Sequence, residues 1–350
     1  MSKLFYRDKP IIGLDISQTG LKVMAVSEKK PLVTGYGSVD LDPVRMQKSL
    51  DGKDDYLSKN IKSLFTKKII GKMPSNNVVL SVPTSRTYAR TFTLPLEAEA
   101  NLEEAISLEA EQYIPVPLGQ LYTDHQVIEY NKDNLVVLMC AVPKTIVDAC
   151  VDAAKQAELE VIMVEPGINA VARLLTLTED GHLPTVIVDI GPTTTDIAIL
   201  DGSIRVTGSI VIGGNTFTLD IAKKMHVPLE NAHQLKVLHG LGAGPRQAKI
   251  TSALEPNLKR IIAETKKVMR YYNERLGATN KLEQVLVVGG GSGIPGLGDY
   301  FTNALVMPAR LASPWQVLDF GKLTQPSKQF KPRYITAGGL ASIKPKDIWS

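Results

Sequence analysis

The apolar positions of this chain fall into short runs separated by polar turns, and two stretches share nearly the same pattern. Residues 10–40 predict three strands joined by two turns, and residues 185–210 predict the same order. In each stretch the first apolar run ends in an aspartate, Asp15 or Asp189, at the start of a polar turn. We interpret the two stretches as an internal repeat, which predicts two related domains whose acid-bearing turns face a shared cleft.

The remaining segments predict how these domains are completed. Residues 40–130 mix helix-like and strand-like patterns and predict a small α/β insertion in the first domain. Helical spacing dominates residues 215–283, which predict a helical subdomain of the second domain. We therefore predict an α/β fold with one domain at 1–184 and another at 185–350, whose last segment, about 334–350, returns to the first domain.

Composition and charge exclude several classes of protein. A chain of 350 residues with 44% hydrophobic and 22% charged residues suits two globular domains. The net charge of +4 is small and the basic residues are scattered, so we expect no nucleic-acid partner. Cys140 and Cys150 lie in apolar segments, as reduced cytosolic thiols do. Residues 1–10 lack the apolar core of a signal peptide, and we expect a cytoplasmic protein.

The turn after Asp189 has the composition of a phosphate-binding loop. Gly191 allows close approach of the backbone, and it is followed by three hydroxyl side chains, Thr193, Thr194 and Thr195. Backbone N–H groups and hydroxyls in such a turn can surround a phosphate. The carboxylate would repel phosphate, so we expect it to hold Mg²⁺ or its waters.

A glycine-rich segment at 289–296 follows an apolar strand near the end of the chain. It contains Gly-x-Gly-x-x-Gly, but residues 300–318 include no acid that could bind a ribose, so we reject a dinucleotide-binding fold. A flat nucleoside lying against glycine backbone explains the segment better, with a simple strand-to-helix turn as the alternative. The chain also lacks the P-loop pattern and the Gly-x-Ser-x-Gly pattern of hydrolases.

Glu165 ends another apolar strand and precedes a helix. Two interpretations are equally compatible with that position. The carboxylate can orient a water molecule beside a γ-phosphate, or it can stabilise the start of the helix through the helix dipole.

Taken together, these segments resemble the actin-like ATPase superfamily. Asp15–Lys22 and Asp189–Asp196 resemble its two phosphate motifs, Glu165–Ala170 its connecting motif, and Gly289–Leu297 its adenosine motif. The resemblance implies two duplicated RNase-H-like domains around a cleft that binds ATP with Mg²⁺.

The resemblance also implies a role for individual residues. Asp15 and Asp189 would hold Mg²⁺ through water, and Glu165 would position the attacking water. Two positions depart from the family, Ser17 in place of a glycine and His233 in place of a glutamate, and we expect any weakening of nucleotide binding there. The residues expected to bind the nucleotide are Asp15, Ser17, Gln18, Thr19, Lys22, Asp189, Gly191, Thr193, Thr194, Thr195, Gly213, Gly214, Lys236, Gly289, Gly290, Gly291, Ser292 and Pro295.

Within the superfamily the chain is most similar to the PilM family of type IV pilus assembly, through residues 104–118, Val142–Lys144 and Ala154–Ala157. This implies a cytoplasmic adaptor that binds ATP, with at most slow hydrolysis, and grips the cytoplasmic N-terminus of a PilN-like inner-membrane protein. It would reach the inner face of the membrane only through that partner, and would connect it to the pilus motor ATPases.

Two alternatives belong to the same superfamily. One is an FtsA-like cell-division protein that self-associates into filaments. The other is a sugar or acetate kinase, which we consider the weaker alternative because no additional acid is placed as a base for such a substrate.

Overall fold

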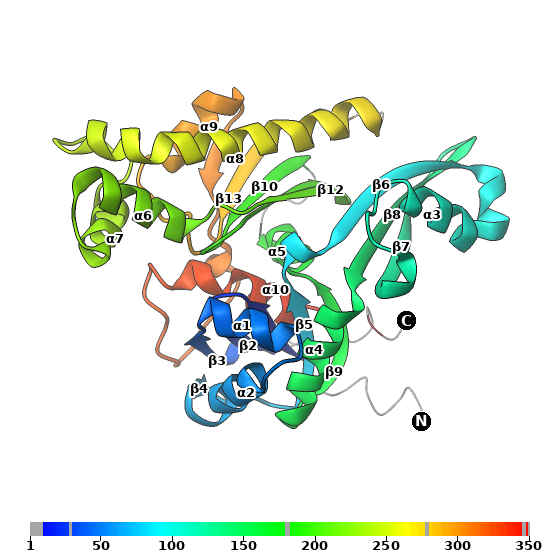
Figure 1. Cartoon of the computed structure of the whole chain (residues 1–350), viewed down its shortest axis with the longest axis horizontal. Helices are drawn as coiled ribbons and strands as arrows, with labels where there is room; N and C mark the ends of the chain where they lie inside the picture. The colour runs from blue at the N-terminus through cyan, green and yellow to red at the C-terminus, as the bar shows by residue number, and fades with distance from the viewer. Residues whose placement is uncertain (1–9, 28–29, 179–182, 277–279, 345–347, 349–350) are drawn as a thin grey trace.

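The computed structural model describes residues 10–27, 30–178, 183–276, 280–344 and 348. The N-terminal residues 1–9, on which the expectation about a signal peptide rests, lie outside this description. Figure 1 shows two main sheets, one above the other, and a smaller sheet that projects to one side. No helix among the described residues is long and apolar enough to cross a membrane.

The first sheet has six strands in the order β4-β3-β2-β1-β5-β9. They are β1 (Ile12–Ser17), β2 (Gly20–Val26), β3 (Val33–Asp40), β4 (Ile69–Gly71), β5 (Asn77–Val82) and β9 (Glu160–Pro166). One face packs against α1 (Pro43–Leu50), α2 (Tyr56–Lys67) and α4 (Lys144–Gln156). The other face packs against α5 (Gly167–Thr178) and α10 (Ile335–Ala341).

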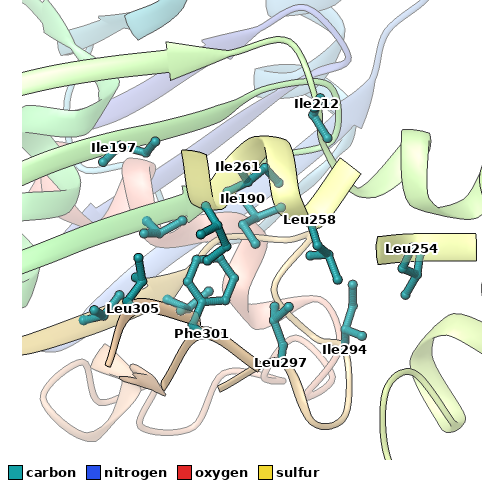
Figure 2. Close-up of a cluster of buried hydrophobic side chains, with 14 of the residues drawn as sticks. Ile190, Ile197, Ile212, Leu254, Leu258, Ile261, Ile294, Leu297, Phe301 and Leu305 are labelled. Carbon is teal, nitrogen blue, oxygen red and sulfur yellow. The ribbon is translucent and has the colours of Figure 1, made fainter. Parts of the chain in front are cut away.

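The second sheet repeats this arrangement with five strands in the order β12-β11-β10-β13-β14. They are β10 (Thr185–Ile190), β11 (Thr195–Asp201), β12 (Ser203–Ile210), β13 (Gln284–Val288) and β14 (Ala309–Leu311). Its helices are α6 (Gly214–Met225), α7 (Leu229–Leu238), α8 (Gln247–Arg275) and α9 (Leu297–Leu305). Figure 2 shows apolar side chains of α8 and α9 meeting those of the strands in one core.

The register of the two leading hairpins confirms the internal repeat. In the first sheet Asp15 pairs across the ladder with Lys22, and in the second sheet Asp189 pairs with Asp196. In each case the hairpin is antiparallel and its first strand pairs in parallel with a later strand, β5 or β13. The spacing of seven residues in the sequence is therefore the spacing of two residues that face each other across a hairpin.

The third sheet differs from the insertion expected at 40–130. It consists of β6 (Tyr88–Pro95), β8 (Asn134–Pro143) and β7 (Leu121–Tyr130), in that order, with α3 (Leu102–Glu111) and a core of its own. Strands β4 and β5, which lie within 40–130, belong to the first sheet. The separate unit therefore begins later than expected because β5 pairs with the distant strand β1, and it ends later because β8 pairs with both β6 and β7.

The third sheet also contacts the second domain. The guanidinium of Arg90 lies 3.4 Å from the ring centre of Tyr113, and its Nε donates to the hydroxyl of Tyr271 on α8 at 3.1 Å. The hydroxyl of Thr91 donates to the backbone carbonyl of Arg205. The same guanidinium lies 5.1 Å from the ring centre of Tyr271, and cation–π contacts of this kind contribute about 0.5–2 kcal/mol each. The contacts to Tyr271 and to Arg205 anchor the small sheet to the second domain, whereas the contact to Tyr113 lies within the small-sheet unit.

Helix α10 carries the end of the chain back to the first sheet. It packs on β1 and α5, and a Cβ built on Gly13 would come within 2.6 Å of the backbone nitrogen of Ala341. The helix can approach the strand this closely because Gly13 has no side chain. Residues 345–347 and 349–350 of the expected segment 334–350 lie outside the described part of the chain.

Candidate functional site

Strand alternation places both repeat aspartates between the two sheets. In β1, Ile12, Leu14 and Ile16 pack toward α1 and α2, so Asp15 shares the opposite face with Gly13 under α10. In β10, even-numbered residues pack toward α8 and α9, so Asp189 shares the opposite face with Ile187. The two aspartates line one cleft of about 790 Å³.

The first acid turn is held by side-chain hydrogen bonds. The Nζ of Lys22 lies 3.1 Å from Oδ2 of Asp15 and donates to the hydroxyl of Ser17 at 2.9 Å. That hydroxyl donates in turn to the carbonyl of Gly20. The hydroxyl of Ser81 on β5 donates to Oδ1 of Asp15 at 2.8 Å. Ser17 therefore stabilises the turn and orients Lys22.

The second acid turn is held by the backbone. The N–H of Gly191 donates to the carbonyl of Thr194 at 2.8 Å, which closes the turn. The carbonyl of Gly191 then accepts from the N–H of Gly214, the first residue of α6. The turn, with Thr193 and Thr194 on the cleft wall, is thus fixed to the start of a helix.

Burial raises the pKa values of both acids in the second turn, and neighbouring negative charges add to the rise at Asp189. Burial, then the charges of Asp196 and Asp15, raise the pKa of Asp189 to about 7, and Lys22 partly opposes this rise. Burial raises the pKa of Asp196 to about 6, although hydrogen bonds from Ser209 and Thr84 oppose it. Buried like charges favour a bound cation, which would relieve their repulsion.

The described residues contain no group of three or more His, Cys, Asp or Glu side chains arranged to hold a metal ion. A metal in the cleft would therefore take only one or two ligands from the acids Asp15 and Asp189. Mg²⁺ commonly keeps several waters and shares phosphate oxygens in this way. The acids present fit a hydrated Mg²⁺ that arrives with a phosphorylated ligand.

A second cavity adjoins the cleft. The two share Pro192, Gly290 and Arg333. Its wall includes Gly214, Gly291 and Gly293. A Cβ built on Gly291 would overlap Ile190 and Gly191, so that glycine lets the segment pack closely against the second acid turn, whereas a Cβ on Gly293 would meet nothing within 4 Å. The position of this cavity beside the cleft suits a nucleoside, with its phosphates in the cleft.

Helix α7 supplies the polar side of this nucleoside cavity. The Nζ of Lys236 donates to the carbonyl of Gly214 at 2.7 Å and to the hydroxyl of Thr218 at 2.8 Å. Burial lowers the pKa of Lys236 to about 8. Burial, followed by the charge of Lys236, lowers the pKa of His233, which keeps this imidazole neutral near pH 7.

Most of the residues expected to bind nucleotide line one of these two cavities. The cleft includes Asp15, Ser17, Gln18, Thr19, Lys22, Asp189, Gly191, Thr193, Thr194, Gly289 and Gly290. The nucleoside cavity includes Gly214, Lys236, Gly290 and Gly291.

Four expected residues lie behind the walls instead. The hydroxyl of Thr195 donates to the carbonyl of Ile212, and that of Ser292 donates to the carbonyl of Gly289. Gly213 packs against the Gly191 turn, and Pro295 accepts a backbone hydrogen bond in a neighbouring loop. These residues shape the site without lining it.

Glu165 is not among the residues that line the cleft, although it pairs in register with Ser81, which pairs with Asp15. The two carboxylate oxygens of Glu165 accept hydrogen bonds from Arg173, each at 2.7 Å, and Arg173 also donates to the carbonyl of Gly339. The Glu165 carboxylate is buried and lines a different cavity, next to β7. The Glu165 carboxylate is therefore engaged by Arg173 and does not line the cleft, and its expected role in positioning water stays a prediction.

Several residues of the cleft were not expected from the sequence. Ser81 faces Asp15 because β5 pairs in parallel with β1, and Thr84, two residues past the end of β5, hydrogen-bonds to Asp196. The strand pattern before Pro83 is the signal that could have located both. Arg333 and Thr336 come from the C-terminal segment, where no local pattern indicates proximity to the cleft.

The comparisons with known proteins agree with this geometry. The cell division proteins FtsA of Borreliella burgdorferi and Neisseria meningitidis are 28% identical over 215 and 200 residues. These matches cover 56% and 51% of this chain, and they span about half the length of each relative, 50% and 46%.

Solved structures show the same fold. A PilM–PilN type IV pilus biogenesis complex superposes with a TM-score of 0.79 at 22% identity, covering 96% of this chain and 98% of the other. MreB5 of Spiroplasma citri bound to ADP superposes with a TM-score of 0.55 at 16% identity, covering 95% of each. The α/β fold is therefore the expected actin-like fold. A family model described as type IV pilus assembly protein PilM matches residues 13–344, and the chain belongs to this family of actin-like proteins.

Proposed function

We propose that this chain is the ATP-binding adaptor of a type IV pilus assembly platform and that it binds the N-terminal peptide of a PilN-like membrane protein. That partner would recruit it to the inner face of the cytoplasmic membrane. The observation that carries the nucleotide part is the pairing of two acid turns across one cleft, next to a cavity with a glycine wall. The similar MreB5 structure holds ADP, which supports a nucleotide in this fold.

The residues of the cleft have separate parts in this proposal. Backbone N–H groups and hydroxyls of the two turns would bind the phosphates, while Lys22 would offset their charge. Asp15 and Asp189 would hold the waters of Mg²⁺, whose role when bound is to neutralise the phosphates. Gly290 and Gly291 would support the base and ribose.

A thermal unfolding experiment tests nucleotide binding. A ligand that binds only the folded state, present at one hundred times its Kd, stabilises that state by about 2.7 kcal/mol. ATP with Mg²⁺ should therefore raise the melting temperature of the wild type, and Asp189→Asn should abolish this rise. Asp133→Asn, on the exposed turn between β7 and β8, serves as a control and should keep it. If the wild type shows no rise, ATP is not its ligand.

The partner proposal rests on a cavity of about 850 Å³ at the seam between the first and third sheets. Its wall combines β7 and β9, which are the outermost strands of their respective sheets. An extended peptide can add to such an edge through main-chain hydrogen bonds and place alternate side chains in pockets. Apolar side chains for such pockets are Val82, Val142, Val147, Met163 and Val164.

A peptide titration tests this groove. A synthetic peptide that copies the cytoplasmic N-terminus of the organism's own PilN-like protein should bind the wild type in calorimetry. Thr123→Trp adds bulk at an exposed position on the groove wall and should weaken binding at least tenfold. Gln126→Trp, exposed on the same strand but outside the groove, should bind normally. Equal binding by both variants would place the peptide elsewhere.

A further inference from the structure

Arg333 lies where the cleft and the nucleoside cavity meet, and it lines both. It belongs to the 3-10 turn η6 (Lys331–Tyr334), which leads directly into α10. A Cβ built on Gly290 would come within 2.9 Å of Cγ of Arg333. The arginine stem therefore extends from the segment packed on the first sheet to the glycine segment of the second domain.

The ion pair between the guanidinium of Arg333 and the carboxylate of Asp40 is accessible to solvent. The Nη2 of Arg333 lies 2.6 Å from Oδ1 of Asp40, at the end of β3. The Asp40 side chain is 79% exposed, whereas that of Arg333 is 27% exposed. Ion pairs of this kind contribute little free energy, about 0–1 kcal/mol. The guanidinium also lies 5.4 Å from the ring centre of the exposed Phe330, a contact that contributes little at such a site. Both contacts are weak, so a stronger anion in the cleft can compete for the guanidinium.

The charge balance of the cleft singles out Arg333. Among the described residues that line the cleft, the acids are Asp15, Asp189 and Asp196, and the cations are Lys22 and Arg333. Lys22 is buried and already bound to Asp15 and Ser17. Of the two cations that line the cleft, Arg333 is thus the one whose acidic partner, Asp40, is exposed to solvent. A guanidinium can donate two parallel hydrogen bonds to two oxygens of one phosphate.

We propose that Arg333 is a specificity residue of the nucleotide site, which moves from Asp40 to the phosphate nearest the ribose when a nucleotide binds. This inference rests on the proposed function and names what the site selects, a nucleoside bearing a 5′-phosphate chain over the bare nucleoside. That phosphate must pass the junction that Arg333 lines. Asp40 keeps the guanidinium at the rim of the cleft while no nucleotide is bound.

Calorimetric titration with ATP, ADP and adenosine, each with Mg²⁺, tests the proposal on three forms of the full chain. Arg333→Gln should weaken ATP and ADP binding about tenfold, which is typical of one lost charge-assisted hydrogen bond, and should leave adenosine within about twofold. Asp40→Asn breaks the same ion pair but keeps the guanidinium. It should bind ATP at least as tightly as the wild type.

Three results would overturn the proposal. If Arg333→Gln binds ATP as tightly as the wild type, Arg333 does not contact the phosphate. An equal loss for adenosine would place Arg333 against the base or ribose. The same loss in Asp40→Asn would make the ion pair a structural link between β3 and η6. If the wild type binds neither ATP nor ADP, the proposed nucleotide function itself fails, and this inference fails with it.

Discussion

The carboxylate of Asp189 lies directly against the backbone of Gly289. A Cβ built on Gly289 would overlap Oδ1 of Asp189 and would lie 2.6 Å from the carbonyl oxygen of Ile190. Gly289 also has a φ of 89°, a conformation that L side chains rarely adopt. The acid turn and the glycine segment, which are distant in sequence, therefore form one packed unit at the base of the cleft.

Gly289→Ala should destabilise the protein by about 3 kcal/mol, from about 1 kcal/mol of backbone strain and about 2 kcal/mol of overlap. It should also remove the stabilisation by ATP, because the overlap displaces Asp189. Urea unfolding measures the first effect. The matched control is Gly202→Ala, since Gly202 has a φ of 69° but nothing within 4 Å of the added Cβ. Equal losses in both variants would contradict the contact with Asp189.

Stability of the nucleotide-free protein should fall as the pH rises from about 4 to about 7. The pKa of Asp189 is raised to about 7, so the folded chain keeps a proton that the unfolded chain has lost across this window. Each such proton contributes a slope of about 1.4 kcal/mol per pH unit. Urea unfolding at several pH values measures the slope, which should level off above pH 7.

Asp189→Asn provides the control for this pH dependence. The amide cannot ionise, so the slope should decrease by the contribution of one proton, leaving that of Asp196, whose pKa is raised to about 6, and the variant should be more stable than the wild type at pH 8. It should gain nothing from ATP with Mg²⁺, since the proposed metal contact is lost. An unchanged slope in this variant would assign the pH dependence to other groups.

The parts of this structure that could be predicted from the sequence are those set by local pattern. The repeat was recognisable because Asp15 and Lys22, like Asp189 and Asp196, face each other within one hairpin. The limits of the inserted sheet were wrong because β5 pairs with β1, more than sixty residues earlier, and no local pattern encodes that pairing. Arg333 was missed for the same reason.

Glu165 has two possible roles that mutation can separate: positioning the attacking water, as the sequence resemblance implies, or forming the ion pair with Arg173 that the structure shows. In the structure Glu165 pairs with Arg173 and does not line the cleft. Removing one partner of a buried ion pair costs about 3–5 kcal/mol, and the 26% exposure of Arg173 favours the low end. Glu165→Ala should therefore lower the free energy of unfolding by about 3 kcal/mol and leave the Kd for ATP within about twofold.

A double-mutant cycle identifies the source of this loss. In Arg173→Met the partner is already gone, so adding Glu165→Ala should cost much less than it does in the wild type. Urea unfolding gives the stabilities, and calorimetry gives the ATP affinity. A variant that unfolds normally but loses ATP hydrolysis would instead support the role of Glu165 in positioning water.

His233 should limit how the site recognises ribose. It lines the nucleoside cavity one helical turn before Lys236, and its lowered pKa keeps it neutral, with a single acceptor nitrogen. His233→Glu would place a carboxylate there, which can accept from both ribose hydroxyls and is supported by Lys236. We expect ATP binding to tighten about tenfold, the effect of one added charge-assisted hydrogen bond.

The affinity for 2′-deoxy-ATP separates ribose recognition from a general charge effect. In His233→Glu, the affinity for 2′-deoxy-ATP should improve less than the affinity for ATP, because 2′-deoxy-ATP lacks one of the two ribose hydroxyls that donate to the carboxylate. Gln234→Glu adds the same charge to the next residue of α7, which does not line the nucleoside cavity, and should change neither affinity. Calorimetry on the wild type, His233→Glu and Gln234→Glu, each with ATP and with 2′-deoxy-ATP, gives the six dissociation constants. Equal gains for ATP and 2′-deoxy-ATP in His233→Glu would show that the carboxylate does not contact the 2′-hydroxyl.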